Sequence, residues 1–142
     1  MTLQNQILLP CAALVLLTAI VWVKMYIDRI AEMRFKRIRP QALTTARHAA
    51  EIFQNVSAAD NFRNLFEMPV LFYGLCIALF ATQMVTSGML LGAWCYVVLR
   101  AAHTTIHLTY NRVNHRFTAY ATSSILLFTL WGIFAVRLLN NS

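Results

Sequence analysis

Residues 89–110 read MLLGAWCYVVLRAAHTTIHLTY, and this run decides both the fold class and the place of the chemistry. Its first half is uncharged, and the whole run is long enough to cross about 30 Å of hydrocarbon as a helix, which takes about 20 residues. Arg100 stands near its middle. A charged side chain at the centre of a membrane helix costs at least about 2.5–3.5 kcal/mol on insertion scales. We therefore expect Arg100 to face the interior of a helix bundle and to find a partner there.

Three further runs of the same kind lie on either side of this one. They cover residues 7–27, 68–86 and 117–139, and each is apolar around most of its circumference. A helix on the surface of a soluble protein would have one apolar stripe, and a membrane β-strand would alternate apolar with polar residues. The sequence therefore predicts an all-α integral membrane protein, a four-helix bundle in which residues 1–142 form a single domain.

The composition supports membrane insertion, and the position of the basic residues argues against nucleic-acid binding. Hydrophobic residues make up 59% of the chain and charged residues 12%, whereas soluble domains have about 45–50% and about 25%. The net charge of +7 would suggest nucleic acid in a soluble protein. Most of the Lys and Arg, however, lie between Asp28 and Glu67, beside the apolar runs. We therefore expect the basic residues to contact the headgroups of membrane lipids, and we do not expect the protein to bind nucleic acid.

The distribution of Lys and Arg also predicts the orientation in the membrane. The long connection before the second run is basic, and the short one before the fourth carries Arg112 and Arg116, whereas the N-terminal tail has no Lys or Arg. Basic connections stay in the cytoplasm. We expect both termini outside the cytoplasm, in the inner membrane if the protein is bacterial. We also expect the second helix to begin near Thr44 or Thr45 and to extend into the cytoplasm.

The third run carries a series of polar residues at helical spacing. Each follows the one before it by three or four positions, which places all of them on one helix face. They are Arg100, His103, His107, Asn111 and Asn114. The spacing predicts a polar face that runs from the middle of the membrane to the cytoplasmic surface and lines a cavity open to the cytoplasm.

The second helix offers a complementary charge. Asp60, Arg63, Asn64 and Glu67 are three or four residues apart and share one face of that helix. We hypothesise that Glu67 pairs with Arg100 and that Asn64 lines the same cavity. Pro69 removes a backbone donor just beyond this face and is able to bend the helix there.

Two other interpretations stay open for these residues. A buried arginine–glutamate pair can serve only to fix the register of two helices. His103 and His107 are four residues apart, a spacing at which two histidines on a helix can ligate a metal or haem. No Cys or carboxylate shares their face, so we predict no metal site.

Three segments, taken in order, resemble a known family. The first is Lys24-Met25-Tyr26 with the basic segment Arg34-Phe35-Lys36-Arg37. The second is Arg63-Asn64-Leu65-Phe66-Glu67 with Pro69 and Phe72-Tyr73. The third is Arg100-Ala101-Ala102-His103, followed by Arg112 and Arg116 before Tyr120. This ordered set covers nearly the whole chain. It resembles the MAPEG proteins, membrane-associated proteins in eicosanoid and glutathione metabolism.

The resemblance implies a homotrimer of four-helix bundles that holds glutathione between subunits near the cytoplasmic face. It places Arg116 against the thiol as the catalytic residue. It places around the rest of the tripeptide a set of polar residues: Arg34, Arg63, Asn64, Glu67, Arg100, His103, His107 and Tyr120. The implied function is a glutathione-dependent membrane transferase or peroxidase, with a small lipophilic electrophile as the second substrate.

Three residues depart from the family pattern. Asp60 stands where many members have an arginine, His107 where a tyrosine is common, and Phe117 where prostaglandin synthases have a small hydroxyl residue. We therefore do not expect prostaglandin synthesis. Asp60 favours an alternative function, that of a non-catalytic lipid-binding or partner-binding protein of the same fold.

Overall fold

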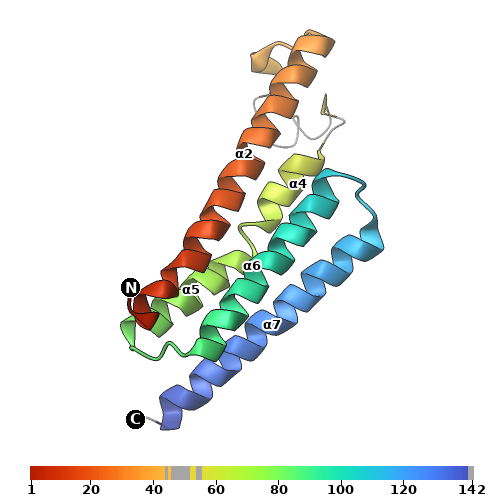
Figure 1. Cartoon of the computed structure of the whole chain (residues 1–142). Coiled ribbons are helices and arrows are strands. Elements are labelled where there is room, and N and C mark those ends of the chain that lie inside the picture. The colour runs from red at the N-terminus through yellow and green to blue at the C-terminus, as the bar shows by residue number, and fades with distance from the viewer. Residues whose placement is uncertain (44, 46–51, 54–55, 141–142) are drawn as a thin grey trace.

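The structure is a computed structural model that describes residues 1–43, 45, 52–53 and 56–140. These residues form a helical bundle (Figure 1). Its elements are α1 (Leu3–Gln6), α2 (Leu8–Lys36), the 3-10 helix η1 (Pro40–Leu43), α4 (Ser57–Asn64), α5 (Met68–Ala81), α6 (Ser87–Leu108) and α7 (Val113–Asn140). In the described part of the chain, four stretches are long and apolar enough to cross a membrane: Leu3–Lys36, Ser57–Ala81, Ser87–Leu108 and Val113–Asn140. The prediction of an all-α membrane bundle of four helices is confirmed.

Both ends of the chain lie at the end of the bundle where α5 turns into α6 (Figure 1). The side chain of Gln4 joins α1 to this turn, because its Nε2 donates to the carbonyl of Gln83 at 2.9 Å and its Oε1 accepts from the amide of Val85 at 3.3 Å. At the opposite end, α2 extends beyond the other helices (Figure 1). The connection between α6 and α7, which contains Arg112, lies toward that end as well (Figure 1).

The second membrane-crossing stretch is broken between α4 and α5. Pro69 sits in the first turn of α5 and has no amide hydrogen to donate to the preceding turn. The chain leaves helical geometry at Glu67, where φ is −93° and ψ is −98°. A helix that stops inside the bundle leaves carbonyls without their usual partners. The carbonyl of Asn64 is one of them, and it is available to a side chain from another helix.

Close packing of α6 against its neighbours fixes the position of its polar residues. Gly92 lets α7 approach closely, since a Cβ atom there would lie 2.7 Å from Cδ2 of Leu130. Phe72 of α5 stacks on Tyr96 of α6, with ring centroids 4.5 Å apart and planes at 17°. Trp131 of α7 donates its Nε1 hydrogen to the carbonyl of Leu71 at 3.1 Å. These contacts hold the three helices in one register.

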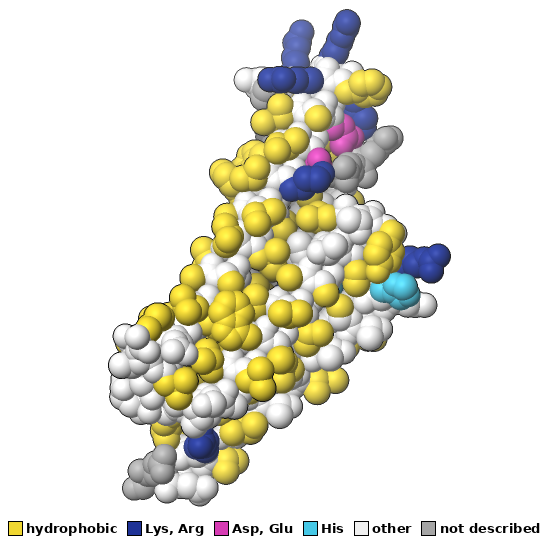
Figure 2. Space-filling view, viewed as in Figure 1, with side chains coloured by type: hydrophobic (Ala, Val, Ile, Leu, Met, Phe, Trp, Pro, Cys, Tyr) yellow, Lys and Arg dark blue, Asp and Glu magenta, His cyan; other side chains and the backbone are white. Residues whose placement is uncertain are grey.

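The surface suits a hydrocarbon solvent over most of the length of the bundle. On the face drawn in Figure 2, hydrophobic side chains cover the body, and most charged side chains gather where α2 ends. Large apolar residues such as Leu16, Leu91 and Ile125 are more than 60% exposed. Water would penalise a continuous apolar surface of this kind, whereas lipid does not.

The predicted start of the second helix near Thr44 or Thr45 lies largely outside the described residues. Thr45 lies in a bend, and Thr44 and residues 46–51 fall outside the described residues. Val56 is not helical, and α4 begins at Ser57. Helix α4 packs into the bundle with residues such as Ala58 and Asn61 buried against neighbouring helices.

Candidate functional site

Arg100 is fully buried in the bundle, as its place in the third run predicts. Its Nη2 donates to the carbonyl of Asn64 at 2.8 Å, which is the carbonyl exposed by the break before Pro69. The guanidinium also lies over the ring of Tyr120, with its carbon 5.3 Å from the ring centroid. Within the described residues, Nε and Nη1 of Arg100 have no hydrogen-bond partner. A buried cation therefore keeps two unused donors.

The predicted ion pair between Glu67 and Arg100 is wrong. The described residues form ion pairs between Lys24 and Asp28 and between Lys36 and Glu32, all outside this site. Glu67 instead accepts a hydrogen bond from the hydroxyl of Tyr120 at 3.5 Å. The helix break is the physical reason, because α4 ends before Glu67 and the side chain of Glu67 stays exposed.

Arg116, in the first turn of α7, is held by side chains from the end of α6 and the following turn. Its Nη1 donates to Nε2 of His107 at 3.1 Å and to Oδ1 of Asn111 at 2.9 Å. Its carbonyl is 3.0 Å from Nδ1 of His103. A carbonyl only accepts, so His103 carries a proton on Nδ1. These contacts fasten the start of α7 to α6.

A cavity of about 230 Å³ opens beside this cluster. It is lined by Asn64, His103, Val113, Arg116, Phe117 and Tyr120. The polar side chains come from α4, α6 and α7, whereas Val113 and Phe117 are apolar and more than 60% exposed. The cavity therefore combines hydrogen-bonding groups with an apolar edge that faces outward.

Several other buried polar atoms near Arg100 lack partners within the described part of the chain. They are Nδ2 of Asn61, the hydroxyl of Tyr96 and Nε2 of His103. Asn61 and Tyr96 lie one helical turn from Asn64 and Arg100, respectively. Buried polar groups in proteins are normally paired, so this set in adjacent turns is available to water, an ion or a ligand. Sequence reasoning missed Asn61, although its spacing of three from Asn64 was a usable signal.

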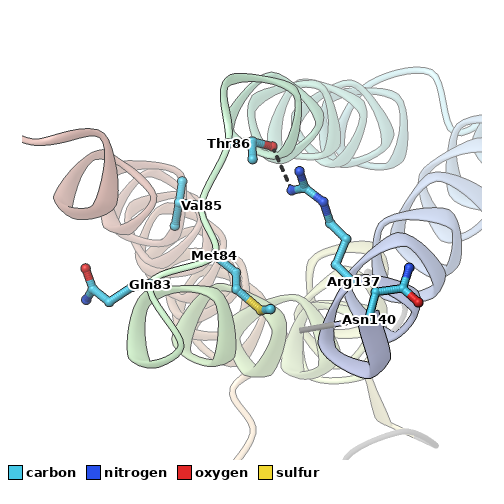
Figure 3. Close-up of a pocket in the computed structure, with 6 residues that line it drawn as sticks. All are labelled: Gln83, Met84, Val85, Thr86, Arg137 and Asn140. Atoms are coloured by element: carbon cyan, nitrogen blue, oxygen red, sulfur yellow. Dashed lines mark hydrogen bonds between the residues drawn. The ribbon is translucent and has the colours of Figure 1, made fainter. Parts of the chain in front are cut away.

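Two further hollows have a different character. One has about 280 Å³ and lies at the end with the α5–α6 turn, where Nη1 of Arg137 donates to Oγ1 of Thr86 at 3.4 Å (Figure 3). The other, an apolar groove of about 380 Å³, lies between α2 and the α4–α5 break and has Trp22 and Phe66 among its lining residues. No histidine lines either of them.

A comparison with known families now identifies the bundle. The model of the MAPEG family matches residues 7–136, nearly the whole chain. The chain belongs to the MAPEG family. No match was found among curated proteins or among solved structures.

Most of the residues that the sequence assigned to a site are together in this MAPEG protein. Asn64, His103, Arg116 and Tyr120 line the cavity. Arg100 and Glu67 both contact Tyr120, and His107 contacts Arg116. Arg34 and Arg63, in the last turns of α2 and α4, are exposed and do not line the cavity.

The predicted polar face of the third run is shorter in the MAPEG protein than its spacing implied. The helix ends at Leu108, and Asn111 lies in the following turn with a left-handed φ of 46°. Asn114 lies on α7 and is exposed. Asn111 reaches the site all the same, through its bond to Arg116, but it comes from a turn and not from the helix face.

The two histidines are not arranged as a ligand pair. Both ring nitrogens of His107 have partners, Oγ of Ser57 at 3.2 Å and Nη1 of Arg116 at 3.1 Å. Nδ1 of His103 is engaged by the Arg116 carbonyl. No group of three or more His, Cys, Asp or Glu residues comes together among the residues that the structure describes. Ligation by both rings would break bonds on which the site depends. Ser57 was not foreseen from the sequence.

Proposed function

We propose that this MAPEG protein is a glutathione-dependent transferase or peroxidase that acts on lipophilic electrophiles in the membrane. The observation that carries the proposal is Arg100, a fully buried cation whose Nε and Nη1 have no partner within the described residues. An isolated charge in the interior is strongly unfavourable. A carboxylate of glutathione would accept a charge-assisted hydrogen bond from one of these donors and compensate the buried charge.

Arg116 would act on the thiol. A free thiol has a pKa of about 8.5, so a few per cent is thiolate at neutral pH. An arginine stays protonated in this range, and its charge favours the thiolate. The thiolate sulfur would attack the electrophilic carbon. A carbon–sulfur bond forms, the leaving group departs with its bonding electrons, and the thiol proton passes to water.

The remaining contacts would position the tripeptide. Asn64, His103 and Tyr120 offer amide, imidazole and hydroxyl groups to the cavity, and Glu67 offers a carboxylate for the ammonium group. Arg34 and Arg63 would contribute from a neighbouring subunit, since they are exposed and do not line the cavity of their own chain. We accordingly propose a homotrimer, with this end of the bundle in the cytoplasm and both termini on the other side.

A second candidate function is the binding of a lipid or a partner without catalysis. The groove between α2 and the α4–α5 break favours it, because a nearly continuous apolar lining open to hydrocarbon suits an acyl chain. Asp60 is exposed on α4 and offers nothing to a substrate carboxylate. In this case glutathione would not bind, and Arg100 would meet an acidic group of another molecule.

Purified protein in detergent distinguishes the two functions. For the enzyme, we expect glutathione to raise the melting temperature and a chlorinated nitrobenzene to be conjugated. Arg100→Ala should lose the thermal shift. Arg116→Ala should keep binding and lose about 10²-fold in rate, the usual loss for one electrostatic donor. Arg112→Ala, an exposed arginine in the turn before α7, is the matched control and should change neither. Wild-type protein that gives no heat with glutathione in calorimetry would favour the second function.

A further inference from the structure

A chain of hydrogen bonds leads from Arg116 to Ser57 on another helix. Nη1 of Arg116 is 3.1 Å from Nε2 of His107, and Nδ1 of His107 is 3.2 Å from Oγ of Ser57. The same hydroxyl donates to the carbonyl of His107 at 2.6 Å. His107 is 1% exposed, and Ser57 is the first residue of α4. Three helical elements thus meet at one imidazole.

The donors and acceptors in this chain can be assigned without ambiguity. A guanidinium nitrogen only donates, so Nε2 of His107 accepts and carries no hydrogen. The Ser57 hydroxyl has one hydrogen and gives it to the carbonyl, so its oxygen accepts from Nδ1 of His107. His107 is therefore neutral, with its proton on Nδ1. Both partners favour this tautomer, Arg116 by donating to Nε2 and Ser57 by accepting from Nδ1.

The anchors of Arg116 are neutral, and this affects its chemistry. Nη1 has two hydrogens, and the imidazole of His107 and the amide of Asn111 accept them both. Nη1 makes both of these bonds, and the side chain lines the cavity. A carboxylate would hold the guanidinium equally well but would cancel most of its charge. Neutral acceptors fix the direction of the group and leave the full positive charge for the cavity.

We infer that His107, oriented by Ser57, is a positioning residue that aims an uncompensated Arg116 guanidinium at the glutathione sulfur. This inference rests on the proposed function and deepens it, since it gives His107 a part other than direct contact with glutathione. Whether the residue that anchors Arg116 is neutral or acidic would then determine what fraction of the bound thiol is ionised. The exposed His115, on the same turn as Arg116 but bonded to Tyr110 at 3.2 Å, takes no part.

Three substitutions at one position separate charge from geometry. His107→Gln keeps a neutral acceptor and should keep the thiolate absorbance of bound glutathione near wild type. His107→Glu keeps an acceptor but pairs with Arg116, so the pKa of the bound thiol should rise by about one unit and the thiolate fraction at neutral pH should fall, by up to about tenfold. His107→Leu should release Arg116 and lower kcat with a smaller change in KM. His115→Gln is the matched control and should leave all these quantities unchanged.

A thiolate fraction in His107→Glu equal to that of wild type and His107→Gln, with glutathione bound in all three, would overturn the inference and leave the proposed function standing. If wild-type protein binds no glutathione, the proposed function fails, and nitrogen-15 NMR of the histidines in the same protein still decides the hydrogen-bond chain. We expect His107 as the neutral Nδ1–H tautomer, kept in Ser57→Ala by the bond from Arg116 and shifting toward a mixture in Arg116→Ala. An Nε2–H tautomer or an imidazolium at neutral pH would show that Arg116 does not donate to this ring.

Discussion

The guanidinium carbon of Arg100 lies 5.3 Å from the centroid of the Tyr120 ring. The hydroxyl of the same tyrosine donates to Glu67 at 3.5 Å, so one aromatic side chain touches both of the charges that the sequence would pair directly. The π face stabilises a cation through its quadrupole and does not neutralise it. Arg100 therefore stays in the bundle as a cation, behind the Tyr120 side chain that lines the cavity.

The ring and the hydroxyl of Tyr120 should contribute differently to stability. Tyr120→Phe keeps the ring over Arg100 and loses the hydrogen bond to Glu67. That bond is long, at 3.5 Å, and its acceptor is an exposed carboxylate, so its loss should cost little. Tyr120→Leu loses both. Since a desolvated cation–π contact contributes about 2 kcal/mol, we expect Tyr120→Leu to lower the melting temperature in detergent clearly and Tyr120→Phe to stay near wild type. Equal losses in the two variants would assign the effect to the hydroxyl.

Glu67 and Arg100 should show weak energetic coupling. Close charge pairs couple by about 1.5 kcal/mol or more in double-mutant cycles, whereas groups joined through a third side chain couple less. A double-mutant cycle of Glu67→Gln and Arg100→Met, measured by unfolding in mixed micelles, tests this. We expect a coupling energy below about 1.5 kcal/mol. We further expect the remaining coupling to disappear when the cycle is repeated in Tyr120→Phe. A strong coupling that persists there would restore the direct pair.

Helical periodicity explains why part of this site could be predicted. Arg100, His103 and His107 are spaced by three and four, and all are buried as a rigid helix requires. The rule works only while the helix continues. Because α6 ends at Leu108, Asn111 is carried into a turn and Asn114 onto the next helix. The position at which a helix ends depends on the packing of the turn, which the spacing does not contain.

Contacts between helices account for the residues that the sequence did not reveal. Ser57 and Asn61 look like ordinary polar positions on α4, and their roles come from His107 and Thr104 on α6. Pro69 signals a bend, but the sequence does not say how far the chain rotates before α5 begins. That rotation is what separates Glu67 from Arg100.

Asn61 tests whether the unpaired atoms around Arg100 serve a ligand. Its side chain is fully buried, its Oδ1 accepts from Thr104 at 3.4 Å, and its Nδ2 has no partner within the described part of the chain. An unsatisfied buried group destabilises the empty protein by about 1–3 kcal/mol. Asn61→Leu should therefore keep or raise the melting temperature while it removes the shift caused by glutathione. Thr104→Val is the control, expected to keep that shift. A variant that melts earlier yet still responds to glutathione would give Asn61 a structural role.

Two glycines of the bundle allow a test of the packing that holds α6 against α7. A Cβ atom at Gly92 would lie 2.7 Å and 3.1 Å from the two terminal carbons of Leu130, whereas a Cβ atom at Gly132 would meet nothing within 4 Å. Leu130 is buried and has little room to move, and overpacking of this kind typically costs about 1–3 kcal/mol. We expect Gly92→Ala to lower the melting temperature in detergent, and Gly132→Ala, which gains helix propensity without a clash, to leave it equal or higher.

The double variant Gly92→Ala with Leu130→Val should recover part of the loss, because the shorter side chain gives back the space. If Gly92→Ala proves as stable as Gly132→Ala, α6 and α7 do not approach each other as closely as the structure has them, and the register that brings His107 to Arg116 would lose its support.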